Sequence, residues 1–252
     1  MDDIEATIVQ NKHIVSNYYT LKLRLEKPMG RALPGQFVML KIPGNEVFLR
    51  RPFSIYAYNK DVLTLMYRIA GKGTEILSNI PKNDKTLVLG PLGNVFNVRN
   101  ADKYFVLAGG IGIAGVRTLI EKLGIRASIF FGCNNKEELP LINDIRDLNP
   151  MVATLDGSYG FKGNVVELFG NHTGSAKGED SQIFVCGPEG MVKSLRKLIE
   201  EERVPCQVLV EERMACGLGL CFGCVTKTID EKEPYKRVCK EGPVFDLWEI
   251  SL

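Results

Sequence analysis

Four of the seven cysteines gather near the end of the 252-residue chain. They follow the spacing C-x4-C-x2-C-x14-C and are Cys216, Cys221, Cys224 and Cys239. In one class of iron–sulfur site, four thiolates with gaps of four and two residues between the first three cysteines hold a [2Fe–2S] cluster. Glycines within the gaps suit such a loop, because they adopt positive φ and let N–H groups approach sulfur. The spacing therefore predicts an iron–sulfur site.

Zinc is the competing metal for the same four cysteines. Structural zinc sites mostly combine two short Cys–Cys pairs, or cysteine with histidine, whereas this segment has one C-x2-C, one longer gap and one distant cysteine. Unliganded thiols are the third interpretation. Cys133 and Cys206 adjoin apolar runs, and we interpret them as small buried hydrophobic residues.

A short motif in the first hundred residues has the chemistry to bind an anion and a flat ring. Arginine pairs with phosphate, an aromatic residue and a backbone edge can flank a ring, and a serine hydroxyl reaches a ring nitrogen. The residues that carry these groups are Arg51, Pro52, Phe53 and Ser54. Alone, the motif also fits an ordinary strand with an exposed arginine.

A second motif runs from a strand through a Gly-x-Gly turn into a helix. We expect Thr74 to cap that helix, which continues through Leu77. A helix N-terminus opened by glycines binds anions, so the two motifs together fit a pyrophosphate. A purely structural turn is the alternative. The residues concerned are Tyr67, Arg68, Ile69, Ala70, Gly73 and Thr74.

A glycine-rich stretch in the middle of the chain matches the dinucleotide fingerprint G-x-G-x-x-G at Gly110, Gly112 and Gly115. It follows a continuous apolar run at 104–108 and precedes a helical pattern at 116–123, which is the context that the fingerprint requires. We therefore expect nucleotide binding by Gly109, Gly110, Gly112 and Ile113. The acid expected about 20 residues later, at the end of the second strand, is missing. Because Glu137 and Glu138 come later, the fingerprint does not distinguish NAD from NADP.

Two more polar or glycine-containing stretches directly follow apolar strands, and ligands of open α/β sheets bind at such strand ends. One begins at Asp156, for which a simple turn residue is the alternative interpretation. The other consists of Cys186, Gly187, Pro188 and Glu189.

Hydrophobic periodicity divides the chain into three parts that position these motifs. Residues 1–99 alternate apolar and polar positions between Gly and Pro, which predicts an antiparallel β-barrel. Residues 100–211 alternate apolar strands with helices, including one at 189–202, which predicts a parallel α/β domain. Residues 212–252 are loop-rich and contain the four-cysteine cluster.

Composition excludes some classes of function. The formal charge is only +2, so a nucleic-acid partner has no support. The N-terminus is acidic where a signal peptide is basic, and no apolar stretch reaches the roughly 18 residues of a membrane span. We expect a cytoplasmic protein.

These motifs, in this order, resemble the ferredoxin reductase superfamily, which joins a flavin-binding barrel to a nicotinamide-binding α/β domain. The resemblance implies FAD beside residues 51–54 and NAD beside residues 109–115. It implies that Ser54 hydrogen-bonds the isoalloxazine, that Arg51 and the Gly73-Thr74 turn hold the pyrophosphate, and that Cys186 lines the nicotinamide site near Glu189. No side chain is expected to act as an acid–base catalyst, because hydride passes directly between the rings.

The stretches 212–221 and 237–245 look like those of the electron-transfer subunits of NAD-dependent, type B dihydroorotate dehydrogenases, although Leu218 and Leu220 replace the usual Ile and Ala. This resemblance implies a partner, an FMN-containing catalytic subunit, in a heterotetramer of two plus two. Electrons would pass from FMN through [2Fe–2S] and FAD to NAD⁺ in pyrimidine biosynthesis. We expect the cluster-bearing tail to meet the partner, with Phe245 and Trp248 as either interface anchors or core residues.

Two other functions remain as alternatives. The small subunit of NAD-dependent ferredoxin:NADP oxidoreductases shares the three-part plan, and co-purification with its ferredoxin-dependent partner would favour it. A zinc-stabilised flavoprotein without enzymatic activity is the alternative from another class, which stoichiometric zinc without iron would favour.

Overall fold

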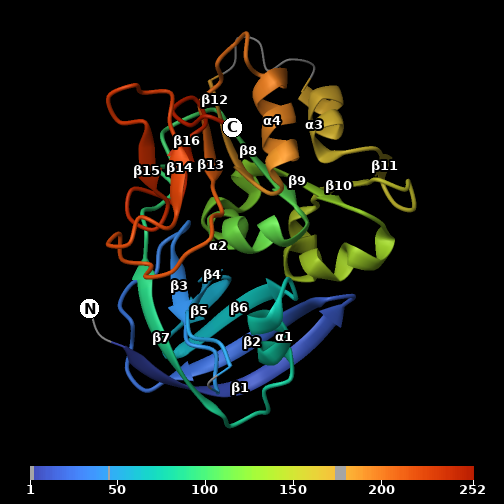
Figure 1. Ribbon diagram of the computed structural model, residues 1–252. Coiled ribbons are helices and arrows are strands. Elements are labelled where there is room, and N and C mark those ends of the chain that lie inside the picture. The colour runs from blue at the N-terminus through green and yellow to red at the C-terminus, as the bar shows by residue number, and fades with distance from the viewer. Residues whose placement is uncertain (1–2, 45, 174–179) are drawn as a thin grey trace.

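The alternating apolar residues of the first hundred positions form one antiparallel sheet (Figure 1). The computed structural model describes residues 3–44, 46–173 and 180–252. The spatial order of the strands is β4-β3-β7-β1-β2-β6-β5, and β4 also contacts β6, so the sheet curls into the expected barrel. Its elements are β1 (Ile4–Val15), β2 (Tyr18–Leu25), β3 (Phe37–Leu40), β4 (Arg51–Ser54), β5 (Ala57–Asn59), β6 (Val62–Arg68), the helix α1 (Lys72–Ser78) and β7 (Lys85–Leu92).

The apolar runs that follow form a second sheet of seven strands, in the order β11-β10-β9-β8-β12-β13-β16. Its strands are β8 (Lys103–Gly109), β9 (Ala127–Cys133), β10 (Met151–Thr154), β11 (Phe161–Lys162), β12 (Ser181–Cys186), β13 (Cys206–Leu209) and β16 (Val244–Asp246). The first six pair in parallel, as expected, and only β16 runs antiparallel to its neighbour. The prediction of a barrel followed by an α/β domain is thus confirmed.

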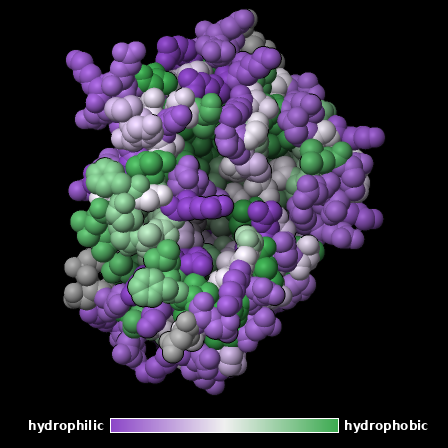
Figure 2. Space-filling view, in the orientation of Figure 1, coloured by the Kyte–Doolittle hydropathy of each residue, from purple (hydrophilic) through white to green (hydrophobic). Residues whose placement is uncertain are grey.

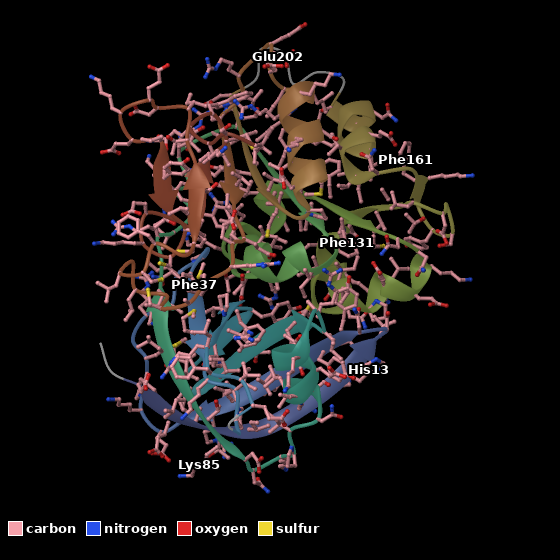
Figure 3. All side chains as sticks on the ribbon, in the orientation of Figure 1. His13, Phe37, Lys85, Phe131, Phe161 and Glu202 are labelled. Atoms are coloured by element: carbon pink, nitrogen blue, oxygen red, sulfur yellow. The ribbon has the colours of Figure 1, made fainter. Side chains whose placement is uncertain are left out.

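Helices cover both faces of this second sheet, which explains the uninterrupted apolar character of its strands. Phe131 belongs to the apolar cluster that includes α2, whereas Phe130 belongs to the one that includes α3 and α4 (Figure 3). Two helices differ from the expected bounds, since α2 starts earlier and α4 ends earlier. The helices are η1 (Gly110–Gly112), α2 (Ile113–Leu123), η2 (Gly124–Arg126), η3 (Lys136–Leu148), α3 (Val165–Thr173) and α4 (Glu189–Leu198).

The last forty residues contain more regular structure than their sequence indicated. They form the hairpin β14 (Val225–Lys227) and β15 (Tyr235–Arg237), and then β16 joins the edge of the α/β sheet beside β13. Sequence patterns had placed the end of that sheet one strand earlier. A three-residue strand such as β16 carries too little periodicity to be recognised.

This segment is held by both of the preceding regions. Asn94, just after β7, donates through its side-chain amide to the carbonyls of Glu241 (2.8 Å) and Val244 (2.7 Å), and its side-chain oxygen accepts from the Val244 N–H (2.9 Å). Phe245 is buried at 4% exposure, and the Trp248 indole donates to the Val204 carbonyl at 3.0 Å. Both aromatics therefore pack within this chain.

Among the described residues, no helix combines the length and the apolar character needed to cross a lipid bilayer.

Candidate functional site

The four clustered cysteines lie on two loops that meet beside β3, where sulfur atoms gather near Phe37 in Figure 3. Each of their sulfurs accepts a backbone N–H. The donors are Leu218 to Cys216 (3.4 Å), Gly219 to Cys239 (3.1 Å), Gly223 to Cys221 (3.4 Å) and Cys239 to Cys224 (3.4 Å). N–H groups that point at sulfur stabilise the thiolate form, which is the form that binds metal.

Glycine is required at two positions of the first loop. Gly217 and Gly219 have φ of 70° and 77°. A Cβ on Gly217 would come within 2.5 Å of Met39 Cγ, and one on Gly219 within 2.7 Å of Lys240 Cδ. The loop can therefore wrap closely around its sulfurs only because these side chains are absent.

The strongest sulfur–sulfur interactions join Cys216 to Cys221 and Cys239 to Cys224, and Cys216 acts more weakly on Cys239. Burial opposes ionisation of Cys216, but the N–H groups of Leu218 and its neighbours outweigh it and lower its pKa to about 6. Burial and the neighbouring Cys224 raise the pKa of Cys239 to about 12. Among the described residues, no group of three or more His, Cys, Asp or Glu side chains is placed to hold a metal ion. The two pairs suit a centre with two irons, each of which takes two thiolates.

The first loop is apolar on its outer side. Leu218, Leu220 and Phe222 are exposed to 43%, 77% and 61%. Cys221 is exposed as well, while Cys224 and Cys239 are buried. Hydrophobic side chains gather on the left flank of the molecule in Figure 2, where this loop runs in Figure 1.

The two motifs of the barrel come together at the start of α1. A Cβ on Gly73 would lie 2.9 Å from Nε of Arg51, so the guanidinium occupies the space that the glycine leaves. Arg51 also donates to the Leu49 carbonyl at 2.7 Å. The arginine and the glycine turn are thus adjacent, which is the arrangement that a shared anion requires.

Thr74 is not the N-cap residue that we expected, because α1 begins at Lys72 with Gly71 as its N-cap. It is the third residue of the first turn, and its side chain accepts from the N-cap N–H, which is one half of a capping box. Its hydroxyl accepts from the N–H groups of Ala70 (2.9 Å) and Gly71 (3.2 Å) and donates to the Gly71 carbonyl (2.9 Å). The side chain therefore closes the turn itself.

Strand alternation separates the remaining residues of the two barrel motifs. Phe53 and Tyr67 point into the barrel core, where their rings meet at 5.8 Å and the Tyr67 hydroxyl donates to Asn11 at 3.0 Å. Only their backbone can reach a ligand outside the barrel. The remaining members are exposed or half-buried, namely Pro52, Ser54, Arg68, Ile69 and Ala70.

A cleft of about 950 Å³ separates the barrel from the carboxyl ends of the parallel strands, and Figure 2 shows the surface hollowed there. Of the predicted nucleotide-binding residues, Gly109, Gly110, Gly112, Gly187, Pro188, Glu189 and Arg68 line it. The two glycine loops press against each other, since a Cβ on Gly112 would lie 2.2 Å from the Cys186 carbonyl oxygen. The backbone of both loops consequently forms one wall of the cleft.

Cys186 and Ile113 do not line the cleft, although the sequence placed both in the nucleotide site. The Cys186 side chain is 1% exposed, and its sulfur lies 2.9 Å from where Gly115 would carry a Cβ. Burial, with Glu211 contributing, raises its pKa far above the ordinary value. The last residue of β12 thus points its thiol toward α2 and away from the cleft.

Some cleft residues escaped the sequence analysis. Glu138 folds back so that its carboxylate accepts from the N–H (3.2 Å) and side-chain amide (2.9 Å) of Asn134, and an acid thereby reaches the end of β9 from the following helix. Tyr18 enters from the barrel, and nothing in the sequence marks it. Glu211 follows β13 in the same way as Glu189 follows β12. An acidic residue just after an apolar strand was therefore a sequence signal that could have identified it. Burial raises the pKa of Glu211, and Arg68 opposes that shift.

A polar contact fixes the barrel to the α/β domain beside this cleft. The Tyr56 hydroxyl donates to Asp144 at 2.5 Å, and Arg117 Nε donates to the other carboxylate oxygen at 3.2 Å. The Arg117 guanidinium also lies over the Tyr56 ring, 5.6 Å from its centre. These contacts restrict how the two walls of the cleft move relative to each other.

Comparison with known proteins gives consistent relatives. Residues 211–251 match the sequence model of the iron–sulfur cluster binding domain of dihydroorotate dehydrogenase B. The chain is 34% identical to a protein of Caldanaerobacter subterraneus subsp. tengcongensis, with 98% of both chains covered, and 35% identical to one of Desulforamulus reducens, with 98% and 97% covered. Both relatives are named dihydroorotate dehydrogenase B (NAD(+)), electron transfer subunit.

Solved structures share the fold. An NADH-dependent reduced ferredoxin-NADP oxidoreductase, described in connection with flavin-based electron bifurcation, superposes with a TM-score of 0.85 at 25% identity, covering 98% of this chain and 89% of that one. A ferredoxin NADP+ reductase from Neisseria gonorrhoeae with bound FAD and NADP gives a TM-score of 0.69 at 19% identity, covering 80% and 92%.

Proposed function

We propose that this chain, which belongs to the family of dihydroorotate dehydrogenase B (NAD(+)) electron transfer subunits, carries electrons between a dihydroorotate-oxidising catalytic subunit and NAD⁺. The observation that carries the proposal is the cysteine loop, in which all four sulfurs accept backbone N–H groups. Such a loop is suited to a redox centre and has no role in binding dihydroorotate itself.

The four thiolates would hold a [2Fe–2S] cluster, with Cys216 and Cys221 on one iron and Cys224 and Cys239 on the other. The pairing of the sulfurs supports this assignment. Gly217 and Gly219 let the loop pack closely against Met39 and Lys240. Hydrogen bonds to sulfur and burial set the reduction potential of such a centre.

FAD would bind across the outer side of the barrel, at the two motifs that meet at Gly73. Arg51 would supply charge to the pyrophosphate, and the first turn of α1, where Gly73 lies against the guanidinium, would supply N–H groups. Ser54 is available to a ring nitrogen, while Pro52 and the backbone of Tyr67, Arg68, Ile69 and Ala70 provide an edge for the ring. Phe53 supports this surface from inside the barrel.

NAD would bind in the cleft, against the paired glycine loops. The backbone at Gly109, Gly110 and Gly112 would hold the pyrophosphate, and Gly187, Pro188 and Glu189, which also line the cleft, would border the nicotinamide. Ile113 and Cys186 support the two loops from behind. When bound, these cofactors supply the redox chemistry, namely hydride exchange between flavin and nicotinamide and single-electron exchange at the cluster. The protein binds and orients them and needs no acid–base side chain.

Each part of the chain would therefore serve one redox group. Residues 1–99 would bind FAD, residues 100–211 NAD and residues 212–252 the cluster. The partner would be a catalytic subunit that contains FMN, in a heterotetramer of two plus two. The apolar outer side of the cluster loop, with Leu218, Leu220 and Phe222, is the surface we assign to that partner, because electrons must leave where the cluster is close to solvent.

Reconstitution with the catalytic subunit tests this function. The chain is purified anaerobically with its cofactors and assayed for NADH oxidation with an artificial acceptor, and for dihydroorotate oxidation with and without the partner. We expect NADH oxidation by the chain alone and NAD⁺-linked dihydroorotate oxidation only with both subunits. Dihydroorotate oxidation by the lone chain would refute the proposed division of labour.

Metal content and partner choice test the alternatives in the same preparation. About two irons per chain and no zinc are expected of a [2Fe–2S] site. Stoichiometric zinc without iron would indicate the non-enzymatic flavoprotein module instead. Stable association with a ferredoxin-dependent transhydrogenase subunit, and none with a dihydroorotate dehydrogenase, would indicate the ferredoxin:NADP oxidoreductase.

A further inference from the structure

Arg237 connects the two pieces of chain that carry the cysteine ligands. Its backbone carbonyl accepts from the N–H groups of Lys240 (3.1 Å) and Glu241 (2.9 Å), so it anchors the turn that contains Cys239. Its side chain reaches the other loop, where Nη1 donates to the Gly219 carbonyl at 2.7 Å. Gly219 in turn donates its own N–H to Cys239 Sγ.

The guanidinium makes two further contacts beside the sulfurs. It lies over the Phe222 ring, 4.7 Å from its centre. The backbone of Phe222 has a φ of 55°, a value that residues other than glycine rarely adopt. It also forms an ion pair with Glu241, through Nη2 and through Nε at 3.0 Å. Both side chains are half-buried, at 21% and 32% exposure.

The charge of Arg237 also acts on the sulfurs themselves. Arg237 precedes Cys239 by two residues and holds the Gly219 carbonyl, while the Gly219 N–H donates to the Cys239 sulfur, so the charge lies beside that sulfur. Glu241 carries the negative charge of the same ion pair, and its electrostatic effect on the cysteine sulfurs is opposite in sign to that of Arg237.

We propose that Arg237 is a positioning residue of the cluster, and that the Arg237–Glu241 ion pair sets the cluster's reduction potential by its charge and by holding the Gly219 loop. Reduction adds one electron to a centre that four thiolates already make anionic, and forms or breaks no bond. A nearby positive charge therefore stabilises the reduced form, and a nearby negative charge destabilises it. This inference rests on the proposed function, since it presupposes the cluster.

The two halves of the ion pair provide a test that a purely structural role would fail. Arg237→Gln should lower the midpoint potential, and Glu241→Gln should raise it. If the pair only kept the loop folded, both variants would break the same contact and shift the potential in the same direction or not at all. Each shift should be on the order of tenfold in the one-electron equilibrium constant, which corresponds to about 59 mV.

The experiment is a redox titration of the full, cofactor-loaded chain with dithionite and mediators, followed by the electron paramagnetic resonance signal of the reduced cluster. Arg24→Gln and Asp61→Asn, which break an exposed ion pair of the barrel, are matched controls and should leave the potential unchanged. Arg237→Lys keeps the charge but not the planar contacts. It should shift the potential less than Arg237→Gln.

Opposite shifts in the two variants support the proposal. Shifts of the midpoint potential in the same direction in both variants, or no shift in either variant, overturn it. If Arg237→Gln does not assemble a cluster, Glu241→Gln and Arg237→Lys decide, and an unchanged or lowered potential in Glu241→Gln overturns the proposal. Failure of the proposed function would look different, because the unsubstituted chain would then contain no iron.

Discussion

The seven cysteines occupy two regions that treat sulfur in opposite ways. In the α/β sheet, Cys133 donates its thiol to the Asn135 carbonyl at 3.3 Å, and Cys186 and Cys206 are each 1% exposed. In the C-terminal loops, every sulfur accepts an N–H instead. Burial alone does not separate the two groups, because Cys224 and Cys239 are also buried.

The difference shows that backbone donors, and not exposure, distinguish a ligand from a packing residue here. A strand uses its N–H groups for the neighbouring strand and has none left for sulfur. A loop opened by glycines can turn several N–H groups inward toward one point. Among the described residues, Cys186 and Cys206 of the sheet therefore have no N–H donor to stabilise a negative charge, whereas each sulfur in the loops accepts at least one N–H.

Removing one cysteine from each region should give the largest contrast. Cys239→Ser should lose the cluster, with iron and the visible absorption of the cluster falling close to zero, because one of four ligands is gone. Cys206→Ser should keep full iron content, although a buried hydroxyl in the core costs about 1–3 kcal/mol of stability. Iron analysis and thermal unfolding separate the two effects. Iron loss in Cys206→Ser would break the distinction.

Glycines of the two regions should give a smaller, reciprocal effect. Gly219→Ala should reduce cluster content and leave NADH binding intact, and Gly112→Ala should do the reverse, since its Cβ would meet the Cys186 carbonyl oxygen. Overpacking of this kind typically costs about 1–3 kcal/mol, so we expect a rise in the KM for NADH of roughly fivefold to 150-fold in Gly112→Ala.

Open positions provide the controls for these substitutions. Gly30 and Gly124 have φ of 84° and 57° with nothing within 4 Å of their Cβ positions. Gly30→Ala and Gly124→Ala therefore measure the effect of backbone strain without a steric contact. If Gly219→Ala behaves like Gly30→Ala, the contact with Lys240 has no role in holding the loop.

The smallest expected effect concerns alkaline pH. Burial, with Glu138 and Asp156 contributing, raises the pKa of Cys133 to about 12. The unfolded thiol ionises near pH 8.5, so the unfolded state releases its proton first. The contribution of the protonated Cys133 thiol to the free energy of unfolding is fully present below about pH 8.5. It is lost as pH rises through the folded-state pKa of about 12.

Urea unfolding, followed by the fluorescence of the only tryptophan, Trp248, measures this dependence. The midpoint should fall steadily from pH 9 upward, and Cys133→Ala should reduce the slope. A midpoint that does not change between pH 8.5 and 10.5 would argue that the sheet cysteines ionise as readily as exposed thiols.

The sequence predicted the parts of the fold and site that depend on local spacing. The cysteine gaps, the alternation in the barrel and the apolar run before Gly109 each reflect a constraint between residues close in the chain. The same local reasoning was wrong about Thr74, because side-chain hydroxyls serve equally well at a cap and inside the first turn.

What the sequence did not reveal depends on contacts between distant segments. Tyr18 reaches the cleft only because the barrel packs under the α/β sheet, and β16 exists only because Asn94 and β13 position the segment that contains it. The direction of the Cys186 thiol follows from the pleat of β12 and from the space left by Gly115. None of these has a local signature.

The central claim, that this chain alone connects NAD to the cluster, is tested most directly by adding NADH anaerobically to the cofactor-loaded chain without its partner. We predict that the flavin absorption bleaches and that the electron paramagnetic resonance signal of the reduced [2Fe–2S] cluster develops in the same sample. Bleaching of the flavin without that signal, in a sample where dithionite does produce it, would contradict the account.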